Sequence, residues 1–185
     1  MRMSSWWTLS VAVVLSACSA EGNGPISPET GGLATTGHAN GAVVESASGS
    51  GRMVLEVFGF TIPQVLGFHA AKLADGSVSG HIDYRQTFEG ETFHFVATVT
   101  CLNVYDGNRA KYGGQITRST DPTVPVGDFM WFQSIDNGEG GSSPPDRSTG
   151  SGFGTEAENE AFCASADLPN PIFLADVIGN IQVHD

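Results

Sequence analysis

An acidic, glycine-rich stretch from residue 136 to residue 146 carries the side chains best suited to binding a cation. It reads DNGEGGSSPPD and holds four oxygen-bearing groups, those of Asp136, Asn137, Glu139 and Asp146. Carboxylate and amide oxygens on such a loop are the ligands that calcium takes, although the spacing is not that of an EF-hand. The same residue types also form turns, because Asp and Asn bond their own backbone and Gly adopts positive φ. Calcium binding and plain turn formation are therefore both consistent with this stretch.

Two histidines, His69 and His81, form the second candidate metal site. If Ala74-Asp75-Gly76 is a three-residue hairpin loop with a left-handed glycine, His69 lies directly across from His81 on the polar face of two strands. Two imidazoles at that distance could share a metal ion, with Asp83 as a diagonal neighbour. The alternative is two solvated histidines that happen to align, because Asp83 is the only candidate for a third ligand.

The sequence contains no recognisable motif of an enzyme active site. The tripeptides Gly49-Ser50-Gly51 and Gly150-Ser151-Gly152 are too short for a nucleophile elbow, and neither a zinc-protease helix motif nor a phosphate-binding loop occurs. We therefore predict that the protein is not an enzyme. A secreted hydrolase is the alternative, because the two carboxylates of a glycosidase pair only in space and leave no motif.

The first residues predict export and a lipid anchor. Arg2 supplies a positive end, and the apolar run from Trp6 to Leu15 is too short to span a bilayer. The run ends in Leu15-Ser16-Ala17-Cys18, which resembles a bacterial lipobox. That resemblance implies cleavage before Cys18, diacylglycerol on its sulfur and an acylated amino terminus, with palmitate as a typical acyl chain. The alternative is an ordinary secretory signal whose cysteine is accidental.

Several acyl chains bury enough methylene groups for stable anchoring in a membrane. Ser19 follows the cysteine, and by resemblance to Gram-negative lipoproteins this favours the outer membrane. From Ser19 to about residue 36 the chain is rich in Gly, Ser, Pro, Thr and Glu, so it buries too little surface to repay the entropy of ordering. We predict a signal peptide over 1–17, a lipidated cysteine with a flexible tether over 18–36, and a single domain over 37–185.

The chain has three cysteines, and lipid on Cys18 leaves Cys101 and Cys163 as the only pair. Outside the inner membrane the surroundings are oxidising, so two thiols that can meet are expected to form a disulfide. Cys101 continues an apolar strand face, which predicts that its sulfur points into the core. The alternatives are two separate buried thiols, or an exposed and free Cys163.

The overall charge restricts the partners. The sequence has 8 Lys and Arg against 20 Asp and Glu, a formal net charge of −12. Nucleic-acid binding requires Lys and Arg at the phosphates, so the balance argues against it, and equally against an electrostatic hold on anionic lipid. The simplest role for the acidity is to keep an exported domain soluble.

The stretch from Val65 to Gly114 positions most of these residues. Three turn signals divide it, at Ala74-Asp75-Gly76, Glu89-Gly90-Glu91 and Asp106-Gly107-Asn108. Between the turns every second residue is apolar, which is the period of a half-buried strand. We predict an antiparallel meander of four strands with one apolar and one polar face. The apolar face carries Val78, Ile82 and Tyr84 in one strand and Phe93, Phe95, Ala97, Val99 and Cys101 in the next.

The rest of the chain predicts further strands and little helix. Pro63 is expected to end a strand or lie at an edge, and Pro169 and Pro171 to prevent regular pairing. A loop is predicted over residues 136–154 and a helical turn over residues 156–164, with a strand that carries Phe162 as the alternative to the turn. The further strands are expected at residues 42–44, 52–60, 111–118, 126–135 and 177–184. The sum is an all-β antiparallel sandwich of about eight to ten short strands with at most one short helical turn.

Four pieces in this order resemble a family of uncharacterised exported bacterial proteins. They are Val99-Thr100-Cys101-Leu102, Gly107-Asn108-Arg109-Ala110, the run from Asp136 to Arg147, and Gly179 to Asp185. The family shows a T-C-L strand, a G-N-x-A turn, a D-N-G-E loop with a later Pro-Asp, and a G-N-x-x-V-H ending. The resemblance implies a small exported β domain with no assigned activity. The polar stretch from Ser148 to Gly154 departs from it, because an apolar strand is expected there.

These features together predict a cell-envelope lipoprotein whose β domain serves in binding or in structure. Its lipid anchor is in the membrane through Cys18, and its partner is a protein or a glycan. One alternative is a calcium-dependent adhesion or carbohydrate-binding module that uses Asp136, Asn137, Glu139 and Asp146. The other alternative is the secreted hydrolase, whose carboxylates would converge only in the fold.

Overall fold

The computed structural model describes residues 41–140, 142–165 and 173–185, which belong to one compact unit, Ala39–Asp185. The predicted signal peptide, Cys18, the tether, Pro169 and Pro171 lie outside the described residues. The described chain forms ten strands and one helix: β1 (Val43–Val57), β2 (Phe60–Leu73), β3 (Val78–Phe88), β4 (Glu91–Tyr105), β5 (Arg109–Ser119), β6 (Phe129–Ile135), β7 (Arg147–Thr149), β8 (Gly152–Gly154), α1 (Glu156–Ala164), β9 (Leu174–Asp176) and β10 (Ile178–His184).

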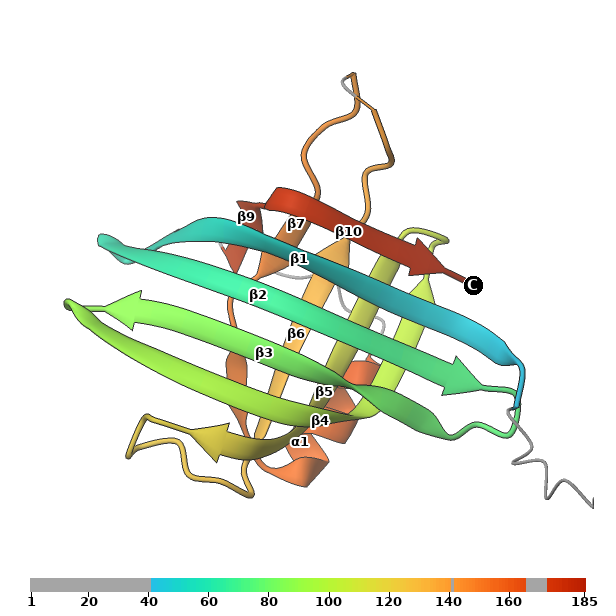
Figure 1. Ribbon diagram of the computed structural model, residues 1–185, viewed down its shortest axis with the longest axis horizontal. Coiled ribbons are helices and arrows are strands. Elements are labelled where there is room, and N and C mark those ends of the chain that lie inside the picture. Colours follow the sequence, from blue (N-terminus) through green and yellow to red (C-terminus); the bar gives the residue numbers. More distant parts are fainter. Residues whose placement is uncertain (1–40, 141, 166–172) are drawn as a thin grey trace, which may run out of the picture. The chain divides into compact units, whose positions relative to one another are not determined.

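The strands form one antiparallel sheet in the order β10-β1-β2-β3-β4-β5-β6-β7-β9, with β8 also paired to β6. The sheet bends back on itself, so that β1 to β4 lie over β5 and β6 (Figure 1). The edge strands β9 and β10 follow each other in the chain, which nearly closes the sheet in the manner of a barrel. The predicted all-β class is confirmed, although the first two strands, with 15 and 14 residues, are longer than expected.

Tight turns connect the first five strands because their residues accept positive φ. The β1–β2 turn is Phe58-Gly59, with φ of 51° and 84°, and the β3–β4 turn is Glu89-Gly90, with φ of 51° and 86°. Two successive positive φ values match the right-handed twist of a hairpin. Gly76, with φ of 84°, closes the β2–β3 connection. The predicted four-stranded meander is confirmed as β2 to β5.

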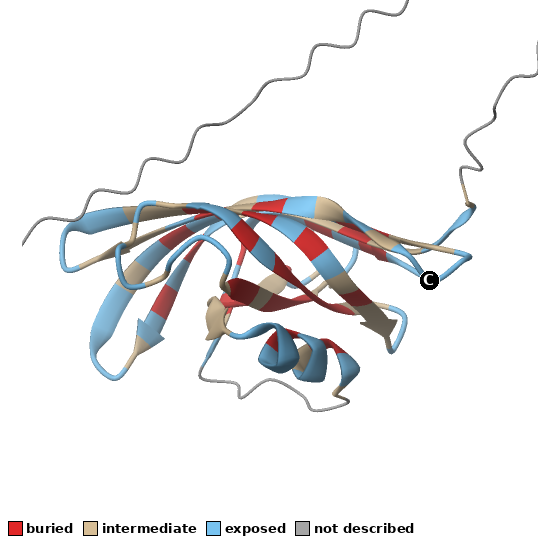
Figure 2. Ribbon diagram, turned by 90° about the horizontal axis from the view of Figure 1, so that it is seen from below, coloured by how far each residue is buried: buried red, intermediate tan, exposed pale blue. Residues whose placement is uncertain are grey.

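The core lies between the two halves of the bent sheet. Figure 2 shows buried and exposed residues alternating along the strands, as the period of the sequence predicts. An aromatic cluster fills the centre: Phe68 stacks on Tyr112 at 4.1 Å between ring centroids, and Tyr84 meets Phe132 edge-on at 5.0 Å. Such pairs add about 0.5–1.5 kcal/mol each beyond the apolar area that they bury.

One strand prediction before the meander is corrected, and the prediction for Pro63 is resolved in favour of an edge position. The separate strands expected at residues 42–44 and 52–60 are one strand, β1, which pairs with β2 along its whole length. Pro63 does not end a strand but takes the other predicted place, at an edge: it lies inside β2, opposite Val54 of β1. The pairing of β2 with β3 begins only at Gln64, so β2 has a free edge at the proline, where the missing N–H costs nothing.

The predicted loop over residues 136–154 is also corrected, because β7 and β8 lie within it. Each has three residues, which is too short for a period to be visible in the sequence. In β7 the side chains of Ser148 and Thr149 are buried and bond to β6: the Ser148 and Ser134 hydroxyls are 3.2 Å apart, and the Thr149 hydroxyl accepts a hydrogen bond from the Gln133 N–H.

The helix predicted over residues 156–164 is confirmed as α1. A capping box begins it: the Glu158 N–H donates to the Thr155 hydroxyl, and the Glu158 carboxylate accepts from the Thr155 N–H at 2.8 Å. The helix packs on β4, β5 and β6, and Figure 2 shows it beneath these strands. It therefore covers the face of the sheet that points away from the aromatic core.

Candidate ligand pocket

A pocket of about 600 Å³ opens where the edge of the sheet is interrupted. β6 pairs with β8 through Phe129–Trp131 and with β7 through Ser134 and Ile135, so Phe132 and Gln133 have no partner strand on that side. The volume lies within the range of about 300–1,000 Å³ that is usual for small-molecule sites. The apolar lining residues are Leu55, Val57, Ile62, Trp131, Phe162 and Phe173, and the polar ones are Gln64, Gln86, Lys111, Gln133, Thr149, Ser151 and Ser165.

Two glutamine amides are buried in the wall. Gln64 of β2 is 3% exposed and Gln133 of β6 is fully buried. The Oε1 atom of each accepts no hydrogen bond from any residue that the structure describes. A buried amide oxygen without a donor costs free energy, about 1–3 kcal/mol. Each of the two oxygens has less than 1 Å² of accessible surface, so neither is open to a molecule in the pocket.

Two tyrosine hydroxyls form hydrogen bonds with the side-chain amides of Gln86 and Gln133. The Tyr84 hydroxyl donates to Gln86 Oε1 at 3.0 Å, so the Gln86 NH₂ group is left for other partners. Gln133 Nε2 donates to the Tyr105 hydroxyl, and Oε1 of the same amide has no hydrogen-bond donor among the described residues. Burial raises the pKa of both tyrosine hydroxyls above their ordinary value, so both stay protonated at neutral pH.

Lys111 supplies the one charge among the described lining residues. Its side chain is 1% exposed, and its ammonium group donates to the Ser165 carbonyl oxygen at 2.9 Å and to the Ser165 hydroxyl at 2.6 Å. The same group lies 5.0 Å from the centre of the Phe162 ring, a cation–π contact. The charge is therefore solvated by the protein itself, and it holds the C-terminal end of α1 against β5.

Two glycines keep the pocket open. A Cβ atom on Gly152 would lie 2.1 Å from the Trp131 indole nitrogen, and one on Gly150 would lie 2.8 Å from Leu55 Cδ2. Neither glycine has positive φ, so space and not backbone conformation requires them. The Trp131 ring can therefore lie against the Gly152 backbone and form a flat part of the wall.

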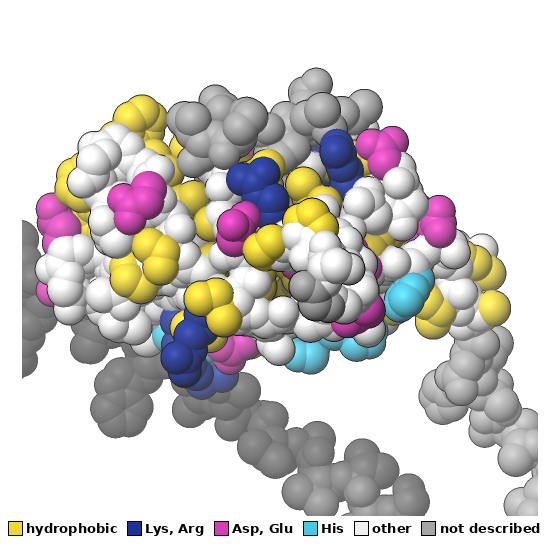
Figure 3. All heavy atoms as spheres, turned by 90° about the horizontal axis from the view of Figure 1, so that it is seen from above, with side chains coloured by type: hydrophobic (Ala, Val, Ile, Leu, Met, Phe, Trp, Pro, Cys, Tyr) yellow, Lys and Arg dark blue, Asp and Glu magenta, His cyan; other side chains and the backbone are white. Residues whose placement is uncertain are grey.

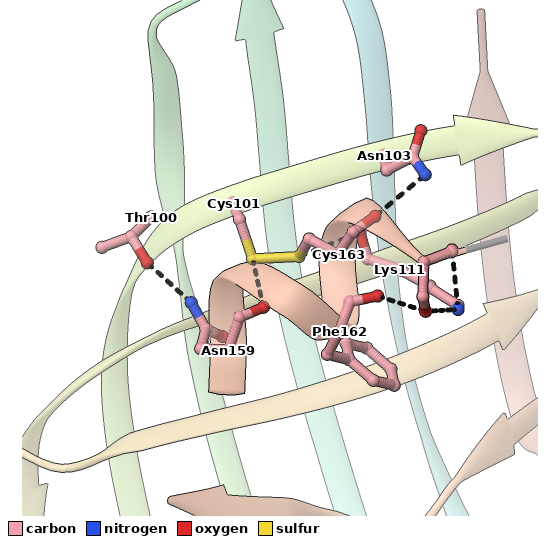
Figure 4. Close-up of a disulfide and its surroundings, with 8 residues drawn as sticks. Thr100, Cys101, Asn103, Lys111, Asn159, Phe162 and Cys163 are labelled. Atoms are coloured by element: carbon pink, nitrogen blue, oxygen red, sulfur yellow. Dashed lines mark hydrogen bonds between the residues drawn. A yellow bond between two sulfur atoms is a disulfide. The ribbon is translucent and has the colours of Figure 1, made fainter. Parts of the chain in front are cut away.

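A disulfide between Cys101 and Cys163 holds α1 in place, with 6.2 Å between the Cα atoms (Figure 4). The predicted pairing is confirmed. Two side-chain hydrogen bonds lie beside it, from Asn103 to the Cys163 carbonyl oxygen at 3.0 Å and from Asn159 to the Thr100 hydroxyl at 3.2 Å. These contacts tie the helix that carries Phe162 to β4.

The predicted direction of the Cys101 side chain is wrong. A bulge at Thr100 shifts the register, because Val99 pairs with Gly114 and Cys101 with Gly113. One extra residue reverses the faces that follow it, so Leu102 enters the core. Cys101 therefore points to the opposite face, toward α1.

The structure does not bring the predicted calcium ligands together around one point. Asp146 is 7% exposed, and its two oxygens accept from the N–H groups of Asn137 and Ile181 at 2.9 and 2.7 Å. Asp136 accepts from Gly138 and Val183. The described residues contain no group of three metal-ligating side chains, and on the face in Figure 3 the acidic side chains lie scattered.

The two carboxylates instead bind the free edge of β10. Ile181 and Val183 belong to this edge strand, and their N–H groups donate to Asp146 and Asp136. Unpaired edge groups favour aggregation, and covering them with a loop prevents it. Of the other two predicted ligands, Glu139 accepts a long hydrogen bond of 3.4 Å from Gln182 of the same strand, and the Asn137 side-chain amide donates to the Pro145 carbonyl oxygen.

His69 and His81 face each other as the register predicted, with 6.5 Å between ring centroids. Asp83 does not join them, because its carboxylate lies 3.0 Å from His94 Nε2. No third ligand completes the pair among the described residues. Both imidazoles are exposed on the polar face of the sheet.

Sequence reasoning missed the pocket. Its signal was present as polar residues at buried positions of strands, namely Gln64, Lys111 and Gln133. A glutamine in an alternating strand does not show whether it faces water or a cavity, and the interruption between β7 and β8 has no local signature. The described lining contains no Asp or Glu, so the carboxylate pair of the alternative interpretation, a secreted hydrolase, is not found there.

Within the described residues, no helix has the length and apolar character needed to cross a membrane. Compared with known proteins, the chain matches no family model, no curated protein and no solved structure.

Proposed function

We propose that the protein is an exported lipoprotein whose β domain binds a small, largely apolar molecule. In this proposal lipid on Cys18 holds the chain at the outer membrane of the bacterial envelope, and the tether lets the domain reach its ligand. The observation that carries the binding role is the pocket of about 600 Å³ with two buried amides in its wall. The resemblance to exported bacterial proteins and the lipobox at Leu15 to Cys18 support the location.

The composition of the pocket supports binding over catalysis. General acid–base chemistry needs a titratable group close to the substrate, such as His, Asp or Glu. The described lining has none of these, and its lysine is held by Ser165 under an aromatic ring. Six apolar side chains with a few fixed polar groups instead match the usual make-up of a ligand site.

Filling the pocket tests the binding role. Val57 lines the pocket, whereas Val54 of the same strand is 50% exposed and absent from the pocket lining. We would purify the full chain from envelopes as Val57→Trp and as the matched control Val54→Trp, and identify co-purified small molecules by mass spectrometry. A molecule carried by the wild type and by Val54→Trp but lost from Val57→Trp supports the proposal. Equal retention by both variants contradicts it.

The anchor has a separate test. Cells that make the wild type or Cys18→Ala would be labelled with radioactive palmitate. We expect label on the wild type alone, together with accumulation of the unprocessed wild-type chain when the lipoprotein signal peptidase is inhibited. Label on Cys18→Ala would contradict a lipid anchor at this residue, and it would leave the binding role untouched.

A further inference from the structure

The turn between β1 and β2 exposes two phenylalanine rings. Phe58 is 84% exposed and Phe60 is 46% exposed. Phe60 pairs with Val57 across the hairpin, and its ring centroid lies 5.2 Å from that of Phe88, at the end of β3. The pairing of β2 with β3 begins only at Gln64, so β2 has no paired strand on that side at the turn. Phe58, Phe60 and Phe88 together form what we name the aromatic tip.

The backbone conformation of Phe58 disfavours the residue found there. Its φ is 51° and that of Gly59 is 84°, and two such values in a hairpin turn favour Asn or Asp before the glycine. The next two hairpin turns have polar residues in the same place, Glu89 and Asp106, with φ of 51° and 55°. A bulky side chain at positive φ is strained, and an exposed ring gains almost nothing from burial. The fold by itself therefore gives no reason for a phenylalanine at this position.

The surroundings of the aromatic tip are acidic. Glu56, Glu89 and Glu91 are exposed at the ends of the two hairpins, and neither 53–64 nor 86–93 contains Lys or Arg. Such a surface is repelled by an anionic bilayer, and by a second copy of this chain, whose net charge is −12. A partner with Lys and Arg around its contact site would instead complement the tip.

The size and place of the tip favour a protein partner over a membrane. A single myristoyl chain gives only marginal binding to a bilayer, and two phenylalanine rings bury no more apolar surface. The chain leads back to Cys18 from the start of β1, and this strand has 15 residues, so the turn that follows it lies roughly 45 Å away (Figure 1). In a protein pocket, by contrast, one aromatic side chain can supply much of the binding free energy.

We propose that the aromatic tip is a docking surface for another protein, one that has an apolar cleft rimmed by Lys or Arg. The ring of Phe58 fills the cleft, and Glu56, Glu89 and Glu91 pair with the basic rim. Burial of the ring in the complex offsets the backbone strain that the free domain bears. None of the three rings of the tip belongs to the pocket lining, so this inference goes beyond the proposed ligand binding and does not depend on it.

Site-specific photocrosslinking in cells that export the full chain tests this docking surface. The photoreactive residue p-benzoylphenylalanine replaces Phe58 in one sample and, as the matched control, Ile178, an apolar residue of β10 that is 80% exposed. We expect one main protein adduct from position 58 and no adduct of that protein from position 178. Mass spectrometry of the adduct should place the crosslink beside apolar residues of the partner that have Lys or Arg near them.

A second set of variants tests the charges. Glu56→Gln, Glu89→Gln and Glu91→Gln together should reduce the adduct from position 58 at least about fivefold. The matched control removes three exposed carboxylates elsewhere, with Glu156→Gln, Glu160→Gln and Asp185→Asn, and should leave the adduct unchanged. An equal adduct in both triple variants would contradict the basic rim.

Phe58→Asn separates docking from a structural role of the ring. Asn accepts the positive φ of this turn, so the melting temperature should equal or exceed that of the wild type. With the photoreactive residue at position 60, the same variant should lose the partner adduct that the chain with Phe58 forms. A lower melting temperature would show that the ring supports the fold and would contradict the proposal.

The other outcomes of the crosslinking also decide. No protein adduct from position 58, or equal adducts from positions 58 and 178, would overturn the docking surface. An adduct with lipid alone would assign the tip to a bilayer, and a crosslinked dimer would assign it to a second copy of this chain, so either result would overturn the proposed partner. None of these results bears on the pocket, which the Val57→Trp experiment tests separately.

Discussion

The hairpins from β2 to β4 and the segment from β6 to α1 are built on different principles. In the hairpins, every strand follows the last in sequence, the turns are tight, and apolar and polar residues alternate. In the later segment, strands of three residues, buried polar side chains and a helix depend on partners far away in the chain, such as Cys101 for Cys163. The first region is specified locally and the second by long-range contacts, and the pocket lies where the two meet.

This difference predicts where a substitution acts. Damage to the hairpin core should lower the stability of the whole domain, because both halves pack on it. Damage to a long-range contact should loosen the later segment first and leave the hairpins protected, since local opening needs less free energy than global unfolding.

The largest effect is expected for Phe95→Ala. Phe95 is fully buried and contacts Tyr84 and Phe153, with ring centroids at 6.0 and 5.0 Å. Loss of a buried aromatic ring costs about 3–5 kcal/mol, and urea unfolding would measure it as a lower midpoint for the whole domain. Phe60→Ala, at a site 46% exposed, is the control with a small effect. An equal loss of stability in Phe95→Ala and Phe60→Ala would contradict the prediction that the buried hairpin core supports the whole domain.

Removal of the disulfide comes next. The bond joins residues 62 apart, and loss of such a bond costs about 2–4 kcal/mol. In the double variant Cys101→Ala, Cys163→Ala we expect the amides of α1 to exchange hydrogen faster while those of β2 to β4 stay protected. Hydrogen exchange read by mass spectrometry distinguishes this from uniform loosening, which would show that the helix and the hairpins unfold as one unit.

The edge cover of β10 gives the third prediction. In Asp146→Ala the buried N–H group of Ile181 and the half-buried N–H group of Asn137 lose their acceptor, at a cost of about 2–3 kcal/mol. Asp185→Ala removes an exposed carboxylate and should change little. Because both Asp146 oxygens are already bonded, the melting temperature should be the same in excess calcium and in chelator. A higher melting temperature in calcium would restore the calcium interpretation of this loop.

The same contrast explains what the sequence could predict. The β2 to β5 meander, its turns and the pairing of His69 with His81 follow from alternation and turn chemistry, which act within a few residues. The cysteine count and the expectation of an oxidising compartment predicted the Cys101–Cys163 pair, but the bulge at Thr100 that turns Cys101 toward α1 has no local signature. The pocket depends on Gln64 and Gln133, which are far apart in the chain, and on an interrupted sheet edge, so the tertiary fold alone reveals it.

The smallest effect is expected at the start of α1. Thr155 caps the helix through its hydroxyl, and Thr155→Ala should cost about 1 kcal/mol, against almost nothing for Thr98→Ala on the exposed face of β4. The Thr155 backbone N–H and hydroxyl both donate to the Glu158 carboxylate at 2.8 Å, and these bonds hold the pKa of Glu158 below its ordinary value.

Because the pKa of Glu158 is lowered in the folded state, the cap stabilises the helix fully at pH values above the ordinary glutamate pKa. This stabilisation is lost as the pH falls through the pKa of Glu158 in the folded protein. Hydrogen exchange of α1 in the wild type and in Glu158→Ala should therefore differ at pH 7 and converge only in acid, below the lowered pKa of Glu158 in the folded protein. The β2 to β4 amides should not respond to Glu158→Ala at either pH. A response there would mean that the cap stabilises the whole domain, and the separation between locally specified hairpins and a long-range segment would not hold.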